Sequence, residues 1–179
     1  MPRIPVHTVD SAPEASRDAL TALESQYGKV LNIHGEMAHS PAVLHAYVAL
    51  QDVLREHGTL DARTREAIAL AVGKEDDCDY CQAAHTGGGR KAGLSDDEMI
   101  DVRRGRAAEP RLDAILVLAR ELAARVGNTS DEAWQSALDA GWSDEQLTEL
   151  TTHVTLNLLT NYFNHHVHTE LDVPAAPEA

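Results

Sequence analysis

Apolar residues three or four positions apart predict helices along most of this chain. The two clearest stripes consist of Val43, Leu44, Tyr47, Leu50 and Leu54, and of Leu112, Ile115, Leu116, Ala119, Leu122 and Val126. No β-branched run alternates with polar residues at period two, and no Asn-Gly or Asp-Gly turn joins two such runs. The pattern therefore predicts an all-α fold.

Capping residues divide this pattern into separate helices. The expected starts are marked by Ser40-Pro41, Asp61, the capping box Ser95–Glu98, Ser130 and the capping box Ser143–Gln146. The expected ends are marked by Gly58, Gly73, Gly93, Gly127 and Gly141. Residues 1–11 and 172–179 hold two prolines each and little periodicity, so we expect extended arms that lie over a neighbouring subunit.

Composition limits the class of protein. A chain of 179 residues with 43% hydrophobic residues fits one globular domain with a sizeable core. The net charge of −14 argues against nucleic acid and anionic membranes as partners. No apolar run is long enough to span a bilayer, and residues 1–20 lack the apolar core of a signal peptide. We therefore expect a cytoplasmic, reducing compartment, where a lone C-x-x-C pair is catalytic or metal-binding.

The chemistry-bearing segment holds both cysteines, as Cys78-x-x-Cys81, followed by His85. On a helix these residues share one face, which favours dithiol redox chemistry with a base beside the second thiol. Glu66, twelve residues before Cys78, lies among apolar neighbours and is expected to orient His85 as an acceptor of the Cys81 proton. Asp77 is expected to oppose ionisation of Cys78, which would make Cys81 the more acidic thiol.

Two features leave alternatives open. The cysteines and His85 could instead bind zinc, with a fourth ligand from His165, His166 or His168. Structural zinc sites usually have a second tight ligand pair, and these distant histidines lack that spacing to the first site. The run Gly87-Gly88-Gly89 indicates either a helix that breaks early or a backbone that is flexible or closely approached.

Glu66, a gap of eleven residues and then Cys78-x-x-Cys81-x-x-x-His85 resemble the signature of the alkylhydroperoxidase D-like branch of the carboxymuconolactone decarboxylase family. Met37–Pro41 and Asn161–His165 are similar to the opening and closing segments of its peroxidase-related members. The resemblance implies an all-α helical bundle over residues 34–172, after an arm and first helix in residues 1–33 and before a tail in residues 173–179.

The resemblance also implies a mechanism and partners. Cys81 would attack a small hydroperoxide and become a sulfenic acid, Cys78 would resolve it to a disulfide, and Glu66 and His85 would relay protons. A thiol or dithiol donor, thioredoxin-like or lipoylated, would restore the pair without a cofactor or metal, and the protein would form a homotrimer or homohexamer. Tyr80 replaces a histidine of well-studied members, which either weakens proton delivery or shapes the pocket.

Two other functions are compatible with the residues. One is a zinc-stabilised or redox-sensing helical scaffold without turnover. The other is a lyase of the carboxymuconolactone decarboxylase type, whose chemistry does not depend on a C-x-x-C pair, so both cysteines count against it.

Overall fold

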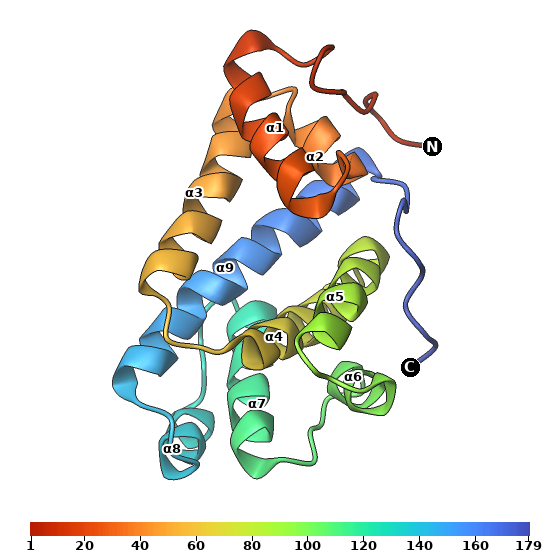
Figure 1. Cartoon of the computed structure of the whole chain (residues 1–179). Helices are drawn as coiled ribbons and strands as arrows, with labels where there is room; N and C mark the ends of the chain where they lie inside the picture. The colour runs from red at the N-terminus through yellow and green to blue at the C-terminus, as the bar shows by residue number, and fades with distance from the viewer.

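The computed structural model describes all 179 residues as nine α-helices joined by short loops, which confirms the all-α prediction (Figure 1). The helices are α1 (Glu14–Tyr27), α2 (Asn32–Met37), α3 (Pro41–His57), α4 (Ala62–Glu75), α5 (Asp79–Lys91), α6 (Asp96–Arg103), α7 (Pro110–Ala124), α8 (Asp131–Asp139) and α9 (Asp144–Val167). None of them is both long and apolar enough to cross a lipid bilayer.

Helices α4 and α9 form the centre of the molecule. Helix α4 packs against α5, α6, α7 and α9, and its residues 67–73 are all buried. A helix that is buried on every side cannot be amphipathic, so its weak helical stripe reflects its central place. Helix α9 runs diagonally through the molecule (Figure 1), and it packs against α3 and α7 as well as α4.

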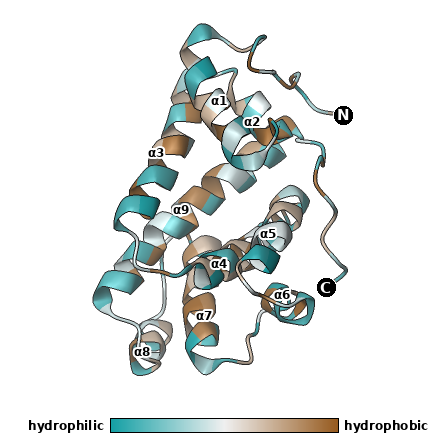
Figure 2. Ribbon diagram, in the orientation of Figure 1, coloured by the Kyte–Doolittle hydropathy of each residue, from teal (hydrophilic) through white to brown (hydrophobic).

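The buried apolar residues form two clusters. The larger one joins α4, α6, α7, α8 and α9, and brown ribbon on α7 and α9 marks part of it in Figure 2. The smaller one joins α1, α2 and α3 to the start of α5, and it contains Cys78, Tyr80 and Cys81. The dithiol therefore lies inside the protein, where the start of α5 meets the N-terminal helices.

Most helix ends follow the capping signals. Asp61 accepts a hydrogen bond from the Thr64 backbone N–H at 2.8 Å, and both predicted capping boxes form. Ser40 is the N-cap residue of α3 and Pro41 its first residue, as predicted, although the Ser40 side chain makes no capping hydrogen bond. One expected end was wrong, since α4 continues past Gly73 to Glu75. Gly73 instead lies inside α4 and faces α5, where a Cβ would lie 3.4 Å from that of Cys81, in ordinary van der Waals contact.

Both terminal arms make contacts along their own chain. The Arg3 backbone N–H donates to the Val167 carbonyl at 2.8 Å, close to the end of α9. The C-terminal arm passes beside α5 toward α6 (Figure 1), and Lys29 pairs with its Asp172 at 2.9 Å. These backbone and ionic contacts hold both arms on their own chain, and the expectation that they also lie over a neighbouring subunit stays a prediction.

Candidate active site

The two cysteines sit at the first turn of α5. Cys78 is the N-cap residue, with φ −84° and ψ 95°, and its Sγ accepts the Cys81 backbone N–H at 3.3 Å. Both thiols are free and almost completely buried. Their Sγ atoms lie 2.7 Å apart, beyond the roughly 2.05 Å of a disulfide bond but within reach of a shared proton. The pair is thus a dithiol ready to share one charge.

The negative charge of this dithiol belongs on Cys78. Contact with the Cys81 thiol, the Cys81 backbone N–H and the Asn164 amide together lower the pKa of Cys78 to about 7, despite burial. Contact with Cys78 and burial raise the pKa of Cys81. The prediction that Asp77 makes Cys81 the more acidic thiol is therefore wrong. The Asp77 carboxylate is exposed and pairs with Lys74 at 3.0 Å, so it does not act on Cys78 as expected.

Glu66 on α4 and His85 on α5 come together beside the dithiol. His85 Nδ1 and Glu66 Oε2 are 2.9 Å apart, and both side chains are partly buried. Burial lowers the pKa of His85, but the charge and hydrogen bond of Glu66 and the charge of Cys78 outweigh it and raise the pKa. The geometry therefore holds a readily protonated imidazole one helical turn beyond Cys81.

The glycine run explains how Glu66 comes so close to α5. The helix does not break there but continues to Lys91. A Cβ on Gly88 would lie 2.6 Å from Glu66 Cδ, and a Cβ on Gly89 would lie 2.6 Å from Met99 Sδ. Since real Cβ atoms do not approach so closely, Gly88 provides the space for the Glu66 carboxylate. Of the two alternatives for the glycine run, the structure therefore shows a closely approached backbone and not a helix that breaks early.

A cavity of about 650 Å³ opens beside this group and is lined by Cys81, Glu66 and His85, but not by Cys78. A polar cluster that the sequence did not reveal lines the cavity where it meets the N-terminal helices. His34 Nε2 lies 3.3 Å from Tyr47 Oη, which accepts a hydrogen bond from Gln51 at 2.6 Å. Burial lowers the pKa of His34 to about 4, so this end of the cavity is polar and uncharged near neutral pH.

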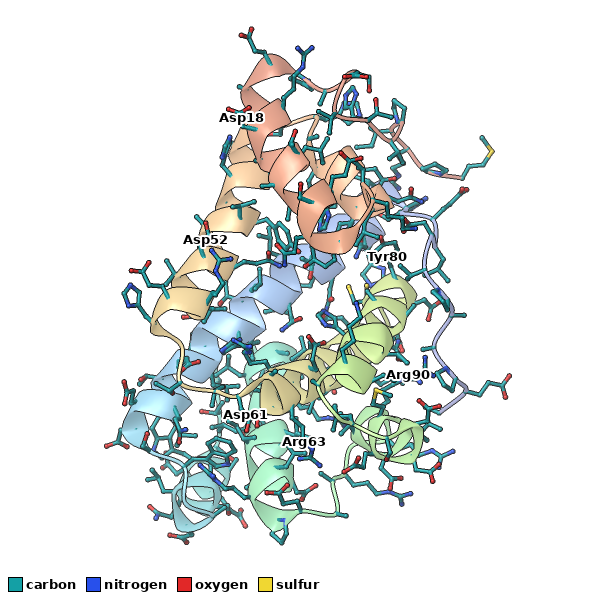
Figure 3. All side chains as sticks on the ribbon, viewed as in Figure 1. Asp18, Asp52, Asp61, Arg63, Tyr80 and Arg90 are labelled. Carbon is teal, nitrogen blue, oxygen red and sulfur yellow. The ribbon has the colours of Figure 1, made fainter.

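Tyr80 closes one edge of the site. The Tyr80 side chain is labelled in Figure 3. Its hydroxyl donates to the Asp172 carboxylate at 2.7 Å, which connects the start of α5 to the C-terminal arm. Burial and the Asp172 carboxylate raise the pKa of Tyr80. Val173 and Pro174, next on the arm, line the cavity. Of the two roles considered for Tyr80, these contacts match that of shaping the pocket.

The histidines at the end of α9 do not complete a metal site. His165 Nε2 contacts the Asp76 backbone carbonyl at 2.8 Å, and His168 occupies the C-cap of α9. No three His, Cys, Asp or Glu side chains are arranged to hold a metal ion. The arrangement needed for the zinc alternative is therefore not formed.

Asn164 is a site residue for which the sequence indicated no role. Its Nδ2 donates to Cys81 Sγ at 3.2 Å and lies 3.7 Å from Cys78 Sγ. The one signal that pointed toward it was the resemblance of the segment Asn161–His165, since no local spacing connects it with cysteines more than eighty residues away.

Known proteins resemble this chain in both sequence and fold. Residues 41–125 match the carboxymuconolactone decarboxylase family. An uncharacterized protein of the cox locus of Paracoccus denitrificans is 32% identical over 68 residues, which are 37% of this chain. The match spans 61% of that relative's length, less than two thirds.

Two solved structures extend the likeness to nearly the whole chain. The alkylhydroperoxidase AhpD core of a peroxidase-related protein from Ralstonia eutropha has a TM-score of 0.85 at 22% identity, over 96% of this chain and 92% of that one. A debrominase in complex with 2,3,4-tribromopyrrole has a TM-score of 0.78 at 14% identity, over 95% and 91%. At these identities the likeness concerns the fold, and it confirms the predicted alkylhydroperoxidase D-like bundle.

Proposed function

We propose, from the match of residues 41–125 to the carboxymuconolactone decarboxylase family, that this chain is a dithiol peroxidase for organic hydroperoxides. The observation that carries the proposal is the placement of Cys81. Its sulfur faces the cavity, contacts the Cys78 sulfur at 2.7 Å and lies one turn from the Glu66–His85 pair. A nucleophile, a neighbouring group that transfers protons and a carboxylate that orients it are the parts that thiol catalysis requires.

Cys81 is assigned the attack because it lines the cavity and Cys78 does not. Its proton passes to the Cys78 sulfur, and the resulting Cys81 thiolate attacks the terminal oxygen of the hydroperoxide. An S–O bond forms and the O–O bond breaks, which gives a sulfenic acid on Cys81 and an alkoxide. Protonated His85, held by Glu66, supplies the proton that converts the alkoxide to an alcohol. The peroxide gains two electrons and Cys81 loses them.

The disulfide forms in the second step. Cys78, now a thiol, attacks the Cys81 sulfenic sulfur, so an S–S bond replaces the S–O bond and water leaves with the Cys78 proton. An external thiol or dithiol, such as a thioredoxin-like or lipoylated protein, then reduces the disulfide by thiol–disulfide exchange and is itself oxidised. The buried position of both sulfurs requires that this donor reach them through the cavity.

The size and polarity of the cavity support an organic substrate. A volume of about 650 Å³ is in the range typical of sites for small organic ligands and far exceeds what hydrogen peroxide needs. The uncharged group of His34, Tyr47 and Gln51 can hydrogen-bond a hydroxyl or carbonyl on the substrate. We therefore expect an uncharged organic hydroperoxide to be reduced faster than hydrogen peroxide.

Consumption of tert-butyl, cumene and hydrogen peroxides, with dithiothreitol or dihydrolipoamide as donor, tests the proposal. Cys81→Ser is expected to abolish turnover, while Cys78→Ser still reacts once and leaves a sulfenic acid on Cys81 that a dimedone probe labels. A label on Cys78 in the Cys81→Ser protein, formed at the wild-type rate, would reverse the roles. Oxidation of the wild type without repeated turnover would instead indicate a redox sensor.

Assembly into a homotrimer or homohexamer, which the family resemblance implies, is part of this proposal. Light scattering of the purified protein is the direct measurement. A stable monomer at micromolar concentration would contradict it.

A further inference from the structure

Asn164 is the polar side chain of α9 that faces both sulfurs. Its residue is only 5% exposed, and its Nδ2 lies 3.2 Å from Cys81 Sγ and 3.7 Å from Cys78 Sγ. An amide N–H cannot be satisfied well by a neutral thiol, because sulfur is a weak acceptor until it is ionised. The contact is therefore worth most when one of the sulfurs carries the negative charge.

The rest of this amide has no compensating contact. Its Oδ1 is buried and unpaired, and leaving such an acceptor without a partner is unfavourable. If this side chain served only for packing, an apolar residue of similar size would fill the same space without leaving a buried carbonyl oxygen unpaired. The donated hydrogen bond to sulfur is what the Asn164 amide provides here.

We propose that Asn164 is a catalytic residue that stabilises the thiolate of the dithiol, and most strongly the attacking form in which Cys81 carries the charge. The assignment follows from the distances, since the amide nitrogen is nearer to Cys81 than to Cys78. The charge therefore gains a shorter hydrogen bond as the proton passes from Cys81 to Cys78. The Cys81 role rests on the proposed function, whereas thiolate stabilisation does not.

The two parts of this inference have different observable consequences. An amide that favours the thiolate lowers the thiol pKa, and in agreement the Asn164 amide contributes to the lowered pKa of Cys78. It also stabilises the reduced protein relative to the disulfide at alkaline pH, where the thiolate is present. Neither property requires a peroxide, so both can be measured even if the physiological oxidant is unknown.

The test compares Asn164→Leu with the wild type. Thiolate absorbance against pH is expected to show the first thiol pKa rising by about one, a tenfold change in the ionisation constant, because a charge-assisted hydrogen bond is lost. Equilibration with a dithiothreitol redox buffer at about pH 9 is expected to show a potential lower by about 30 mV, the equivalent of a tenfold change. Under single turnover, the rate of hydroperoxide reduction near neutral pH is expected to fall about tenfold or more.

Asn157→Leu is the matched control, since Asn157 is also a buried amide of α9. Its Nδ2 donates to the His153 carbonyl at 2.8 Å and contacts neither sulfur, so this variant is expected to keep the thiol pKa of the wild type. Should Asn164→Leu not fold, the side-chain amide resonance of Asn164 in the wild type serves instead. Its nitrogen shift is expected to titrate with the same midpoint as the thiolate absorbance and to lose this titration after oxidation.

The outcomes separate the two proposals. A thiol pKa unchanged in Asn164→Leu, or an amide resonance that ignores thiol ionisation, overturns the role of Asn164. A raised pKa in a protein that reduces no hydroperoxide would retain thiolate stabilisation and reject the peroxidase. If Asn164→Leu shows a raised thiol pKa and a lowered potential but an unchanged single-turnover rate, thiolate stabilisation stands. Only the stronger stabilisation of the Cys81 thiolate would then be rejected.

Discussion

Replacing Gly88 by alanine is expected to disable the Glu66–His85 pair while leaving the fold intact. The added Cβ would lie 2.6 Å from Glu66 Cδ and 2.8 Å from Glu66 Oε1. Carbon atoms in contact need about 3.5–4.0 Å, so the carboxylate has to retreat by about 1 Å. The Glu66–His85 hydrogen bond, 2.9 Å long, does not survive a displacement of that size.

The effects on stability and on rate differ in size. Alanine in place of a mid-helix glycine stabilises by about 0.5–1 kcal/mol, and a lost hydrogen bond destabilises by about 0.5–1.5 kcal/mol. These terms nearly cancel, so the free energy of unfolding measured with urea is expected to change little. A catalytic group displaced by about 1 Å can slow a reaction about 10²-fold, and we expect that loss in single-turnover reduction of cumene hydroperoxide.

A second measurement does not depend on the peroxidase proposal. Because Glu66 raises the pKa of His85 against the effect of burial, its displacement is expected to lower that pKa in an NMR titration. Gly87→Ala is the matched control, since its Cβ would meet no atom within 4 Å. It is expected to gain the helix stabilisation and keep both the rate and the His85 pKa. In a Glu66→Gln background, Gly88→Ala should slow the reaction little further.

Wild-type values of the rate and of the His85 pKa in Gly88→Ala would refute the reasoning. They would mean that Glu66 can accommodate the methyl group and still hold His85. A large loss of rate in Gly87→Ala would contradict it as well, since that substitution leaves Glu66 untouched.

Three further predictions concern other parts of the molecule. The pKa of His34 is about 4 in the folded protein and 6.5 in the unfolded chain. Between these values the unfolded chain binds more protons, so the free energy of unfolding falls as the pH drops from about 6.5 to 4, by about 3 kcal/mol from His34. Urea unfolding of His34→Gln should therefore depend less on pH in that range, and the same dependence as in the wild type would contradict the assignment. Mild peroxide treatment is expected to remove two hydrogens by joining Cys78 to Cys81, and mass spectrometry that found each thiol over-oxidised separately would argue against it. Tyr80→Phe removes the hydrogen bond to Asp172 and should speed hydrogen exchange in the C-terminal arm, whereas unchanged exchange would mean that the other contacts of Asp172, with Lys29 and Asn32, are enough to hold the arm.

The helices were largely predictable because their signals are local. Periodic apolar residues, two capping boxes and glycines at helix ends lie within a few positions of what they control. Helix α2 was missed because six residues are too few for periodicity to be visible. Gly73 was misinterpreted because a glycine that ends a helix and one that lies inside a helix look the same in sequence.

The sequence by itself determined the dithiol and its neighbouring His85, because motif spacing fixes which side chains share a helix face. Glu66 lies on a different helix, and its approach to His85 was expected from its apolar neighbours and from the family resemblance. Only the tertiary structure decided which sulfur carries the charge. That choice depends on the N-terminus of α5, on the contact between the two sulfurs and on an amide from α9, 86 residues from Cys78. A thiol pKa reflects every dipole and charge that the fold brings near the sulfur, and most of these come from distant parts of the chain.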